Sequence, residues 1–160
     1  MKQGFVKVAS ATPRIRVADP VYNAQVICEQ AKEAAEHGAK IVVFPELCIT
    51  GYTCNDLFLQ ELLLEKAKEA LLTIVEETGQ LEALFLVGLP VDKDGRLYNV
   101  AAVLYRGRIL GMIPKKNIPM YAEFYEGRHF TPGEETVTEY RLGKQEIPFG
   151  TNLLFRCEEL

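Results

Sequence analysis

Residues 40–52, Lys-Ile-Val-Val-Phe-Pro-Glu-Leu-Cys-Ile-Thr-Gly-Tyr, decide the fold of this chain. The β-branched run from Lys40 to Phe44 is typical of a short strand that is buried on both faces. Pro45 ends this strand, and Glu46 follows it directly. Because the ends of buried strands commonly present functional side chains, Glu46 is a candidate general base. Taken alone, a glutamate at such a place more often caps a loop or pairs with a surface lysine.

The segments on either side of this stretch indicate alternating strands and helices, followed by a meander of strands. Asp19 is the predicted N-cap of a first helix that starts at Pro20, and Asp56 is the predicted cap of a second helix. An Asp-Gly pair at 94–95 and an Arg-Gly pair at 106–107 predict tight turns. This order indicates an α/β protein, with a mixed sheet and helices packed on one of its faces. The expected strands are 5–9, 40–44, 83–89, 98–105, 108–113, 139–142 and 152–155, and the expected helices are 19–38 and 56–79.

Composition excludes several classes of protein. The chain has 160 residues, of which 48% are hydrophobic and 25% charged, and its net charge is −4, so a nucleic-acid partner is not expected. No apolar run approaches the roughly 18 residues of a membrane span, and early charges argue against a signal peptide. We therefore expect a cytoplasmic protein without a membrane partner. Four cysteines without a C-x-x-C pair, and only two histidines, predict no metal site.

Two further features could carry chemistry. Lys115 and Lys116 follow an apolar strand, and a lysine beside a carboxylate keeps both groups charged and can stabilise an oxyanion. The alternative is a solvated strand end. Residues 121–126, Tyr-Ala-Glu-Phe-Tyr-Glu, either line a polar substrate pocket or form a surface loop that its aromatic side chains hold in place. Spacing alone does not bring Glu46 and Lys115 together, and no glycine-rich phosphate loop or nucleophile elbow is present in the sequence.

The motifs resemble a known family. Residues 44–52, followed by Asp-Leu-Phe at 56–58, resemble the first signature of the nitrilase, or carbon-nitrogen hydrolase, superfamily. This version of the signature is similar to that of glutamine-dependent NAD synthetases. Residues 98–103 resemble the strand that follows in those enzymes, and residues 114–126 resemble their lysine motif. The likeness runs over nearly the whole chain, with the motifs in matching order.

The resemblance implies roles for individual residues. Members of the superfamily use a Glu–Lys–Cys triad, in which Glu46 matches the general base and Lys115 the lysine that stabilises the tetrahedral intermediate. Lys116 is the weaker match, because the family's lysine directly follows the proline. Tyr121 matches a tyrosine that contacts glutamine at the entrance of the pocket. Glu126 matches a second glutamate that supports the lysine.

The resemblance also implies the reaction and its partners. A cysteine attacks the side-chain amide of L-glutamine and releases ammonia, which passes to a second domain. That domain, with ATP and Mg²⁺, amidates nicotinic acid adenine dinucleotide to NAD, whereas the glutaminase part needs no cofactor. The family assembles as homo-oligomers. Two alternatives remain at this stage: a stand-alone amidase or carbamoylase of the same superfamily, and a non-catalytic assembly domain.

The nucleophile is the point at which the sequence departs from the family. The family's cysteine lies in a G-x-E-x-C-E-D strand end, which Cys157 does not match, and Cys157 is expected to be an ordinary thiol in a partly buried strand. Cys48 and Cys54 lie within the Glu46 motif, but neither is the expected nucleophile. We therefore expect residues 1–160 to be the N-terminal portion of a nitrilase-like α-β-β-α sandwich. The later sheet, the nucleophile and the synthetase domain would be absent, and this portion would be inactive alone.

Overall fold

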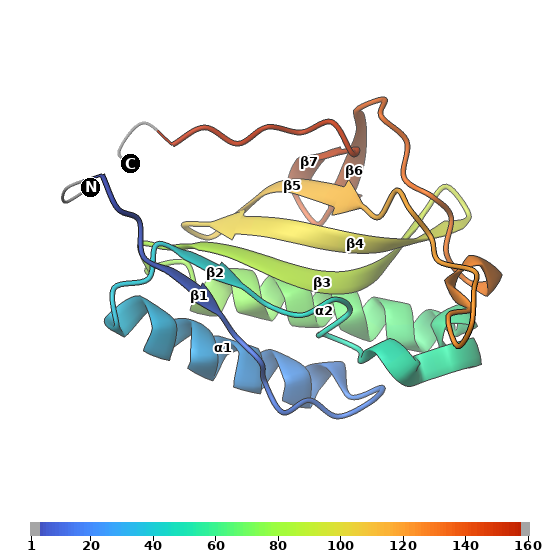
Figure 1. The fold of residues 1–160 in the computed structure, drawn as a ribbon, viewed down its shortest axis with the longest axis horizontal. Coiled ribbons are helices and arrows are strands. Elements are labelled where there is room, and N and C mark those ends of the chain that lie inside the picture. Colours follow the sequence, from blue (N-terminus) through green and yellow to red (C-terminus); the bar gives the residue numbers. More distant parts are fainter. Residues whose placement is uncertain (1–3, 158–160) are drawn as a thin grey trace.

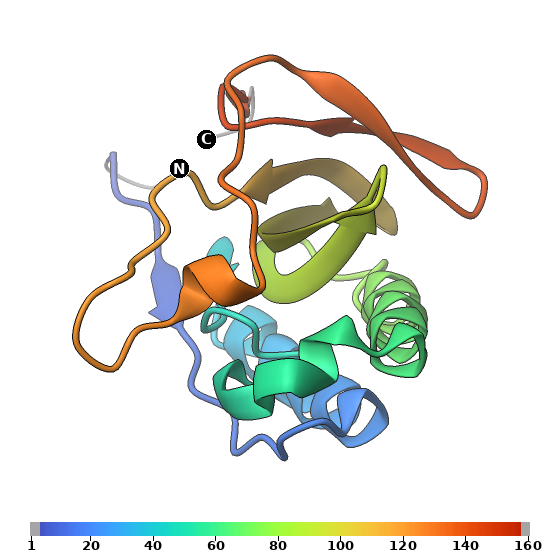
Figure 2. The same ribbon diagram turned by 90° about the vertical axis from the view of Figure 1, so that its right-hand side faces the viewer.

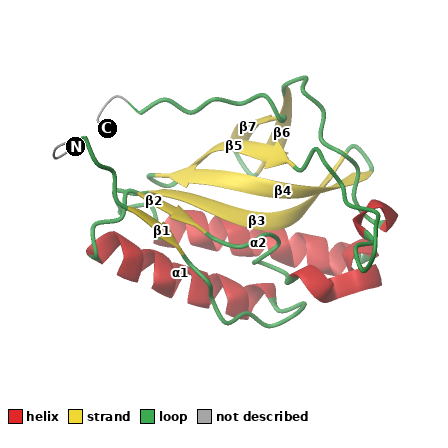
Figure 3. Ribbon diagram, viewed as in Figure 1, coloured by secondary structure: helices red, strands yellow, loops and turns green. Residues whose placement is uncertain are grey.

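The computed structural model describes residues 4–157 as a seven-stranded mixed sheet with two long helices against one face (Figures 1 and 3). The strand order is β1-β2-β3-β4-β5-β7-β6. The predicted fold class, an α/β mixed sheet with helices on one face, is therefore confirmed. The strands are β1 (Val8–Ser10), β2 (Ile41–Val43), β3 (Leu84–Lys93), β4 (Arg96–Tyr105), β5 (Arg108–Pro114), β6 (Thr138–Leu142) and β7 (Gln145–Phe149). The helices are α1 (Pro20–Glu36) and α2 (Glu61–Glu77), with 3₁₀ segments η1 (Tyr52–Leu59) and η2 (Glu126–Arg128).

The first three strands run parallel, and α1 and α2 connect them in turn. Crossovers of this kind are right-handed, so two of them that progress in one direction across a sheet place both helices on the same side. Figure 2 shows the result, with α1 and α2 together below the strands. No helix in the described part of the chain combines the length and the apolar character needed to cross a membrane.

Two hairpins join β3, β4 and β5, as the sequence predicted. Asp94 and Gly95 have φ angles of 53° and 71°, and Arg106 and Gly107 have φ angles of 45° and 72°. Positive φ at both central residues is the mark of the turn type that matches the twist of paired strands. The β3–β4 pairing runs without a shift from Phe85 to Lys93, whereas the β4–β5 pairing shifts register once, between Val103 and Leu104. The turns thereby place the ends of β3 and β5 on the same sheet.

The hydrophobic core lies between the helices and the sheet. Ile27 of α1 and Leu71 and Ile74 of α2 are fully buried, and they share one cluster with Val42 and Phe85 of the sheet. Burying an Ile, Leu or Phe side chain contributes about 1.5–3 kcal/mol. Local signals agree with this packing: Asp19 Oδ1 accepts a hydrogen bond from the Tyr22 backbone N–H at 3.1 Å, so the predicted N-cap of α1 is confirmed.

The predicted start of the second helix was wrong. The helix α2 begins at Glu61, with Gln60 at the N-cap position, and the segment before it forms η1. Asn55 within η1 has a φ of 50° and a ψ of −132°, which interrupts any continuous helix through this segment. Asp56 does not cap a helix, because its carboxylate is paired with Arg128 from a distant loop. A tertiary ion pair has taken the place of the local cap.

Two of the predicted strands were also misplaced. Residues 152–155 are not a strand, and the last strand is β7, which pairs with β6 around Gly143 at φ 57°. The first regular strand is Val8–Ser10 instead of 5–9. An added Cβ on Gly111 would lie 2.9 Å from Leu153 Cδ1 and 3.0 Å from Phe155 Cζ, so the segment after β7 packs side chains against β5. These contacts are not hydrogen-bonded pairing, which explains the absence of a strand.

Candidate active site

Glu46 lies on a sharp turn after β2. The Phe44 N–H still bonds to the Leu86 carbonyl of β3 at 2.9 Å, whereas Leu47 has a φ of 51° and turns the chain away. Such a φ is rare and strained for a leucine. The Leu47 carbonyl accepts from the Gly51 N–H at 2.7 Å, which closes the turn. The turn lies directly on β3, because a Cβ on Gly88 would be only 2.4 Å from Leu47 N.

Lys115 lies immediately after β5. Its backbone N–H donates to the Asn99 carbonyl of β4 at 2.7 Å, which continues the β4–β5 pairing by one residue. The Gly133 N–H donates to the Lys115 carbonyl at 2.9 Å, so the backbone of Lys115 is held on both sides. Its side chain is therefore aimed by two strands and by the end of the long loop 115–133.

Folding brings Lys115 into contact with two carboxylates. Lys115 Nζ lies 2.7 Å from Glu46 Oε1, and 2.8 Å and 3.0 Å from Glu126 Oε1 and Oε2. The Glu46 side chain is 41% exposed, Lys115 is 29% exposed and Glu126 only 5%. The structure thus brings together three of the residues that the resemblance singled out, although 69 residues separate Glu46 from Lys115.

Two polar residues that the sequence analysis did not single out complete this cluster. Tyr52 donates its hydroxyl to Glu126 Oε1 at 2.9 Å, and Asn99 donates its side-chain amide to Glu46 Oε1 at 2.5 Å. The signal for Asn99 was an uncharged polar residue inside an otherwise apolar strand, since buried polar groups need partners. The signal for Tyr52 was its place at the end of the Thr-Gly-Tyr motif.

The electrostatics of the cluster keep its cation charged. Burial alone would lower the pKa of Lys115, but hydrogen bonds and charges from Glu126 and Glu46 outweigh burial and raise it above its ordinary value. Burial and the neighbouring Glu126 carboxylate raise the pKa of Tyr52 to about 12. Tyr52 therefore remains a neutral hydroxyl that donates to Glu126 throughout the physiological range.

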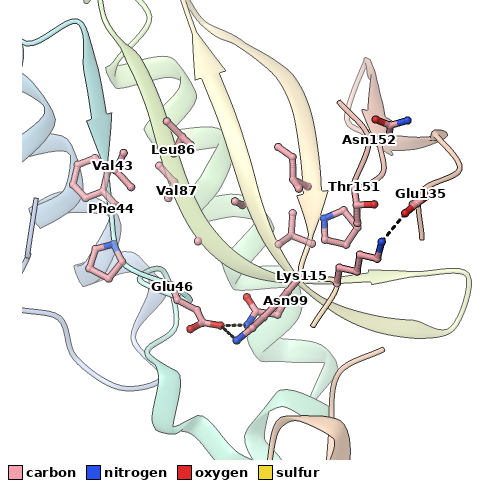
Figure 4. A pocket seen from close by; sticks show the side chains of 17 residues that line it. Val43, Phe44, Glu46, Leu86, Val87, Asn99, Lys115, Glu135, Thr151 and Asn152 are labelled. Carbon is pink, nitrogen blue, oxygen red and sulfur yellow. Dashed lines mark hydrogen bonds and ion pairs between the residues drawn. The ribbon is translucent and has the colours of Figure 1, made fainter. Parts of the chain in front are cut away.

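A cavity of about 700 Å³ opens beside Glu46 and Lys115 on the sheet face that the helices leave free (Figure 4). Its walls are mainly apolar side chains from β2, β3, β4 and β5. Figure 4 shows Glu46, Asn99 and Lys115 converging at one end. Figure 4 also shows a second group of polar side chains at another end, from Glu135, Thr151 and Asn152. An apolar hollow with a few converging polar groups is the usual form of a small-molecule site.

Tyr121 and Lys116 lie outside the cluster. The Tyr121 side chain is 68% exposed and contacts Phe124, with ring centroids 5.6 Å apart, and it is not among the residues that line the cavity. Lys116 lines the cavity but pairs with Glu135 at 2.6 Å. Of the two neighbouring lysines, only Lys115 contacts Glu46 and Glu126, which agrees with the stronger motif match.

Three of the four thiols in the described part of the chain are poorly placed to act as nucleophiles. Cys28, Cys48 and Cys54 are buried, and burial raises the pKa of Cys48 to about 12. A thiol with so high a pKa forms almost no thiolate, which is the nucleophilic form. Cys157 is exposed and outside any strand, so its expected place in a partly buried strand was wrong. Residues 4–157 hold no group of three His, Cys, Asp or Glu side chains arranged for a metal ion.

A second ion pair fastens the loop that carries Glu126. Asp56 in η1 accepts from Arg128 Nε at 2.9 Å and from Arg128 Nη2 at 3.1 Å, and it lies 3.1 Å from His129 Nε2. The hydrogen bonds from Arg128 and His129 lower the pKa of Asp56 to about 2. The rings of Phe58 and Phe130 pack edge to face beneath this pair, with centroids 5.0 Å apart. The loop is therefore anchored two residues from Glu126.

Lys115 lies between Glu46 and Glu126 at the strand ends of a half-covered α/β sheet, which is the arrangement that the resemblance to carbon-nitrogen hydrolases implies. Residues 7–153 match the family model described as carbon-nitrogen hydrolase, and this chain belongs to that family. The chain is 40% identical over 159 residues to the glutamine-dependent NAD(+) synthetase of Mycobacterium tuberculosis, covering 99% of this chain and 23% of that protein. It is 36% identical over 135 residues to the enzyme of the same name from Thermotoga maritima, covering 84% of this chain and 23% of that protein.

Solved structures agree with this assignment. A glutamine-dependent NAD(+) synthetase from Cytophaga hutchinsonii superposes with a TM-score of 0.89 at 28% identity, covering 96% of this chain and 26% of that chain. An amidase from Nesterenkonia sp. shares the fold alone, with a TM-score of 0.67 at 23% identity, covering 89% of this chain and 54% of that one. The chain spans about a quarter of the length of the curated relatives it matches.

Proposed function

We propose that this chain is part of a glutaminase that supplies ammonia for the ATP-dependent amidation of nicotinic acid adenine dinucleotide to NAD. The observation that carries the proposal is the contact of Lys115 Nζ with Glu46 at 2.7 Å, at one end of a cavity of about 700 Å³. The names of the relatives with about 40% identity, all glutamine-dependent NAD(+) synthetases, support glutamine as the substrate. They favour this reading over a stand-alone amidase.

The proposed chemistry follows from the positions of the charges. Glu46 takes the proton from a cysteine thiol while the sulfur forms a bond to the amide carbon of glutamine. The positive charge of Lys115 stabilises the negative charge that develops on the amide oxygen. Ammonia then leaves with a proton returned by Glu46, and water releases glutamate from the thioester. Glu126, buried and in contact with Lys115 and Tyr52, holds the lysine in place.

The remaining expectations belong to the same proposal. ATP and Mg²⁺ would act in the synthetase part of the protein. Contact of Tyr121 with glutamine stays a prediction from the family resemblance, because Tyr121 does not line the cavity of this chain. Reduced, buried thiols fit a cytoplasmic setting. Assembly into homo-oligomers stays a prediction from the family resemblance.

The test separates glutamine-dependent from ammonia-dependent NAD formation in the full-length protein. Glu46→Gln and Lys115→Ala should each lower the glutamine-dependent rate by at least about 100-fold, because each removes a group that acts on the transition state. The ammonia-dependent rate should persist. Residues 1–160 alone should release no glutamate from glutamine, because burial raises the pKa of the Cys28, Cys48 and Cys54 thiols and Cys157 does not match the family's nucleophile motif.

A matched control comes from an ion pair on the helical face. Lys32 Nζ and Glu77 Oε2 are also 2.7 Å apart, but they join α1 to α2 away from the cavity. Lys32→Ala and Glu77→Gln should leave both rates unchanged. Full glutamine-dependent activity in Glu46→Gln would show that the chain is not a glutaminase of this type and would favour a non-catalytic role.

A further inference from the structure

The two carboxylates that contact Lys115 differ in how their oxygens are used. Glu126 accepts hydrogen bonds on both oxygens: Tyr52 and Lys115 donate to Oε1, and Lys115 and Asn99 donate to Oε2. In Glu46 both donors converge on one oxygen, since Lys115 Nζ and Asn99 Nδ2 lie 2.7 Å and 2.5 Å from Oε1. No donor among residues 4–157 bonds to Glu46 Oε2. Figure 4 shows this oxygen on the side of the carboxylate away from both donors.

Asn99 directs its hydrogen bond to Glu46 Oε1 from a buried position within the sheet. It lies within β4, is only 4% exposed, and is paired in the β3–β4 ladder opposite Pro90. Its backbone carbonyl accepts from the Lys115 N–H at 2.7 Å, while its side chain donates to Glu46. One strand residue therefore sets the backbone of the lysine and the side chain of the glutamate. The amide must present its nitrogen to the carboxylates, because they accept hydrogen bonds and do not donate them when ionised.

This inference rests on the glutaminase proposed above. We propose that Asn99 is a positioning residue that, together with Lys115, occupies Glu46 Oε1 and so presents Glu46 Oε2 as the atom that receives the proton of the attacking thiol. An oxygen that already accepts two short hydrogen bonds, one of them from a cation, uses its lone pairs for those bonds. It is therefore the weaker proton acceptor of the two oxygens. The other oxygen keeps its lone pairs for the thiol. The S–H bond breaks, its proton goes to Oε2, and the sulfur electron pair forms the bond to the amide carbon.

The choice of asparagine follows from the same geometry. Asn99 Nδ2 lies between two carboxylates, at 2.5 Å from Glu46 Oε1 and 3.5 Å from Glu126 Oε2. A neutral amide can donate to both without a proton that either could remove. An aspartate there would keep the shape but replace the donor with a third carboxylate, whose negative charge would repel Glu46 and Glu126.

The experiment compares two buried asparagines in the full-length protein. Asn23 is fully buried on the helical side and donates to the Arg16 and Ile49 carbonyls at 2.7 Å and 2.9 Å, so it matches Asn99 in burial and in the number of its acceptors. Asn99→Ala should lower kcat for glutamine hydrolysis by about 10- to 100-fold, the size expected for one hydrogen bond to a charged group. Its KM should change by less than about threefold, because the hydrogen bond that is lost stabilises the transition state and not the bound substrate. Asn99→Asp should lower kcat further than Asn99→Ala does.

Asn23→Ala should lower the melting temperature but keep kcat per folded molecule within about threefold of wild type. The proposal is overturned if Asn99→Ala or Asn99→Asp keeps wild-type kcat while Glu46→Gln is inactive. It is also overturned if both alanine variants lose kcat in step with their loss of melting temperature, because the role of Asn99 is then only structural. If Glu46→Gln itself is active, the glutaminase proposal fails instead, so the two failures are distinguishable.

Discussion

The two faces of the sheet differ in composition and in role: one face packs against the helices, and the other carries the candidate active site. The face under α1 and α2 is sealed by fully buried side chains such as Ile27, Leu71 and Ile74. The opposite face holds the cavity, with Glu46 and Lys115 at one end of it. The first face requires apolar side chains that pack closely. The second depends on a few hydrogen bonds between residues that follow or belong to separate strands. Stability and chemistry should therefore respond to different substitutions.

The largest expected effect on stability comes from the helical face. Ile74→Ala should reduce the free energy of unfolding by about 2–5 kcal/mol, because Ile74 is fully buried and its truncation leaves a cavity. The rate per folded molecule should stay near that of wild type. Urea unfolding of the full-length protein measures the first quantity, and glutamine-dependent NAD formation measures the second. Leu62→Ala on the same helix is the control, because Leu62 is 70% exposed and should cost little.

Gly88→Ala should lower both the stability and the activity, unlike substitutions that affect only one face of the sheet. The added Cβ would lie 2.4 Å from Leu47 N and 2.7 Å from the Pro45 carbonyl, and these backbone atoms cannot rotate away. We expect a cost of about 1–3 kcal/mol from overpacking, together with a loss of activity, because the turn that carries Glu46 must move. Stability and glutamine-dependent rate are measured on the same sample.

Gly111→Ala is the matched control for this prediction. The atoms nearest to its Cβ would be at the ends of the Leu153 and Phe155 side chains, at 2.9 Å and 3.0 Å. Side chains can shift, so Gly111→Ala should cost less than Gly88→Ala and leave the rate closer to wild type. Equal losses in the two variants would contradict the view that the turn at Leu47 aims Glu46.

The smallest expected effect concerns the pair that anchors the Glu126 loop. Asp56→Asn should destabilise the protein, and the difference from wild type should depend on pH. The pKa of Asp56 is lowered from 3.8 to about 2, so its contribution to stability is fully present above pH 3.8 and is lost as pH falls towards about 2. Urea unfolding at several pH values across this window measures the difference.

Asp94→Asn is the control for the pH series. Asp94 is also an exposed acid, but it sits in a hairpin turn in which Asn-Gly is as suitable as Asp-Gly. Asp94→Asn therefore removes an exposed carboxylate that does not anchor the Glu126 loop, and an equal effect of the two variants would contradict the role given to Asp56. A difference for Asp56→Asn that is constant from neutral pH to pH 2 would show that the carboxylate charge does not anchor the loop.

Much of the fold was readable from local signals. The N-cap at Asp19, the strand before Pro45, and both hairpin turns act between residues close in sequence, and the structure confirms them. The start of α2 was misread because the local cap signal at Asp56 lost to an ion pair with Arg128, which is 72 residues away. No local pattern contains such a partner.

By itself, the sequence determined the order of the elements, their periodicity and the motifs, since these depend on neighbouring residues and on backbone propensity. Only the tertiary structure decided which polar atoms meet. Strand pairing put Asn99 beside Lys115, and the close approach of the Leu47 turn to Gly88 brought Glu46 within 2.7 Å of Lys115. Hydrogen bonds and ion pairs act over a few ångströms, and residues far apart in sequence come that close only when the whole sheet is folded.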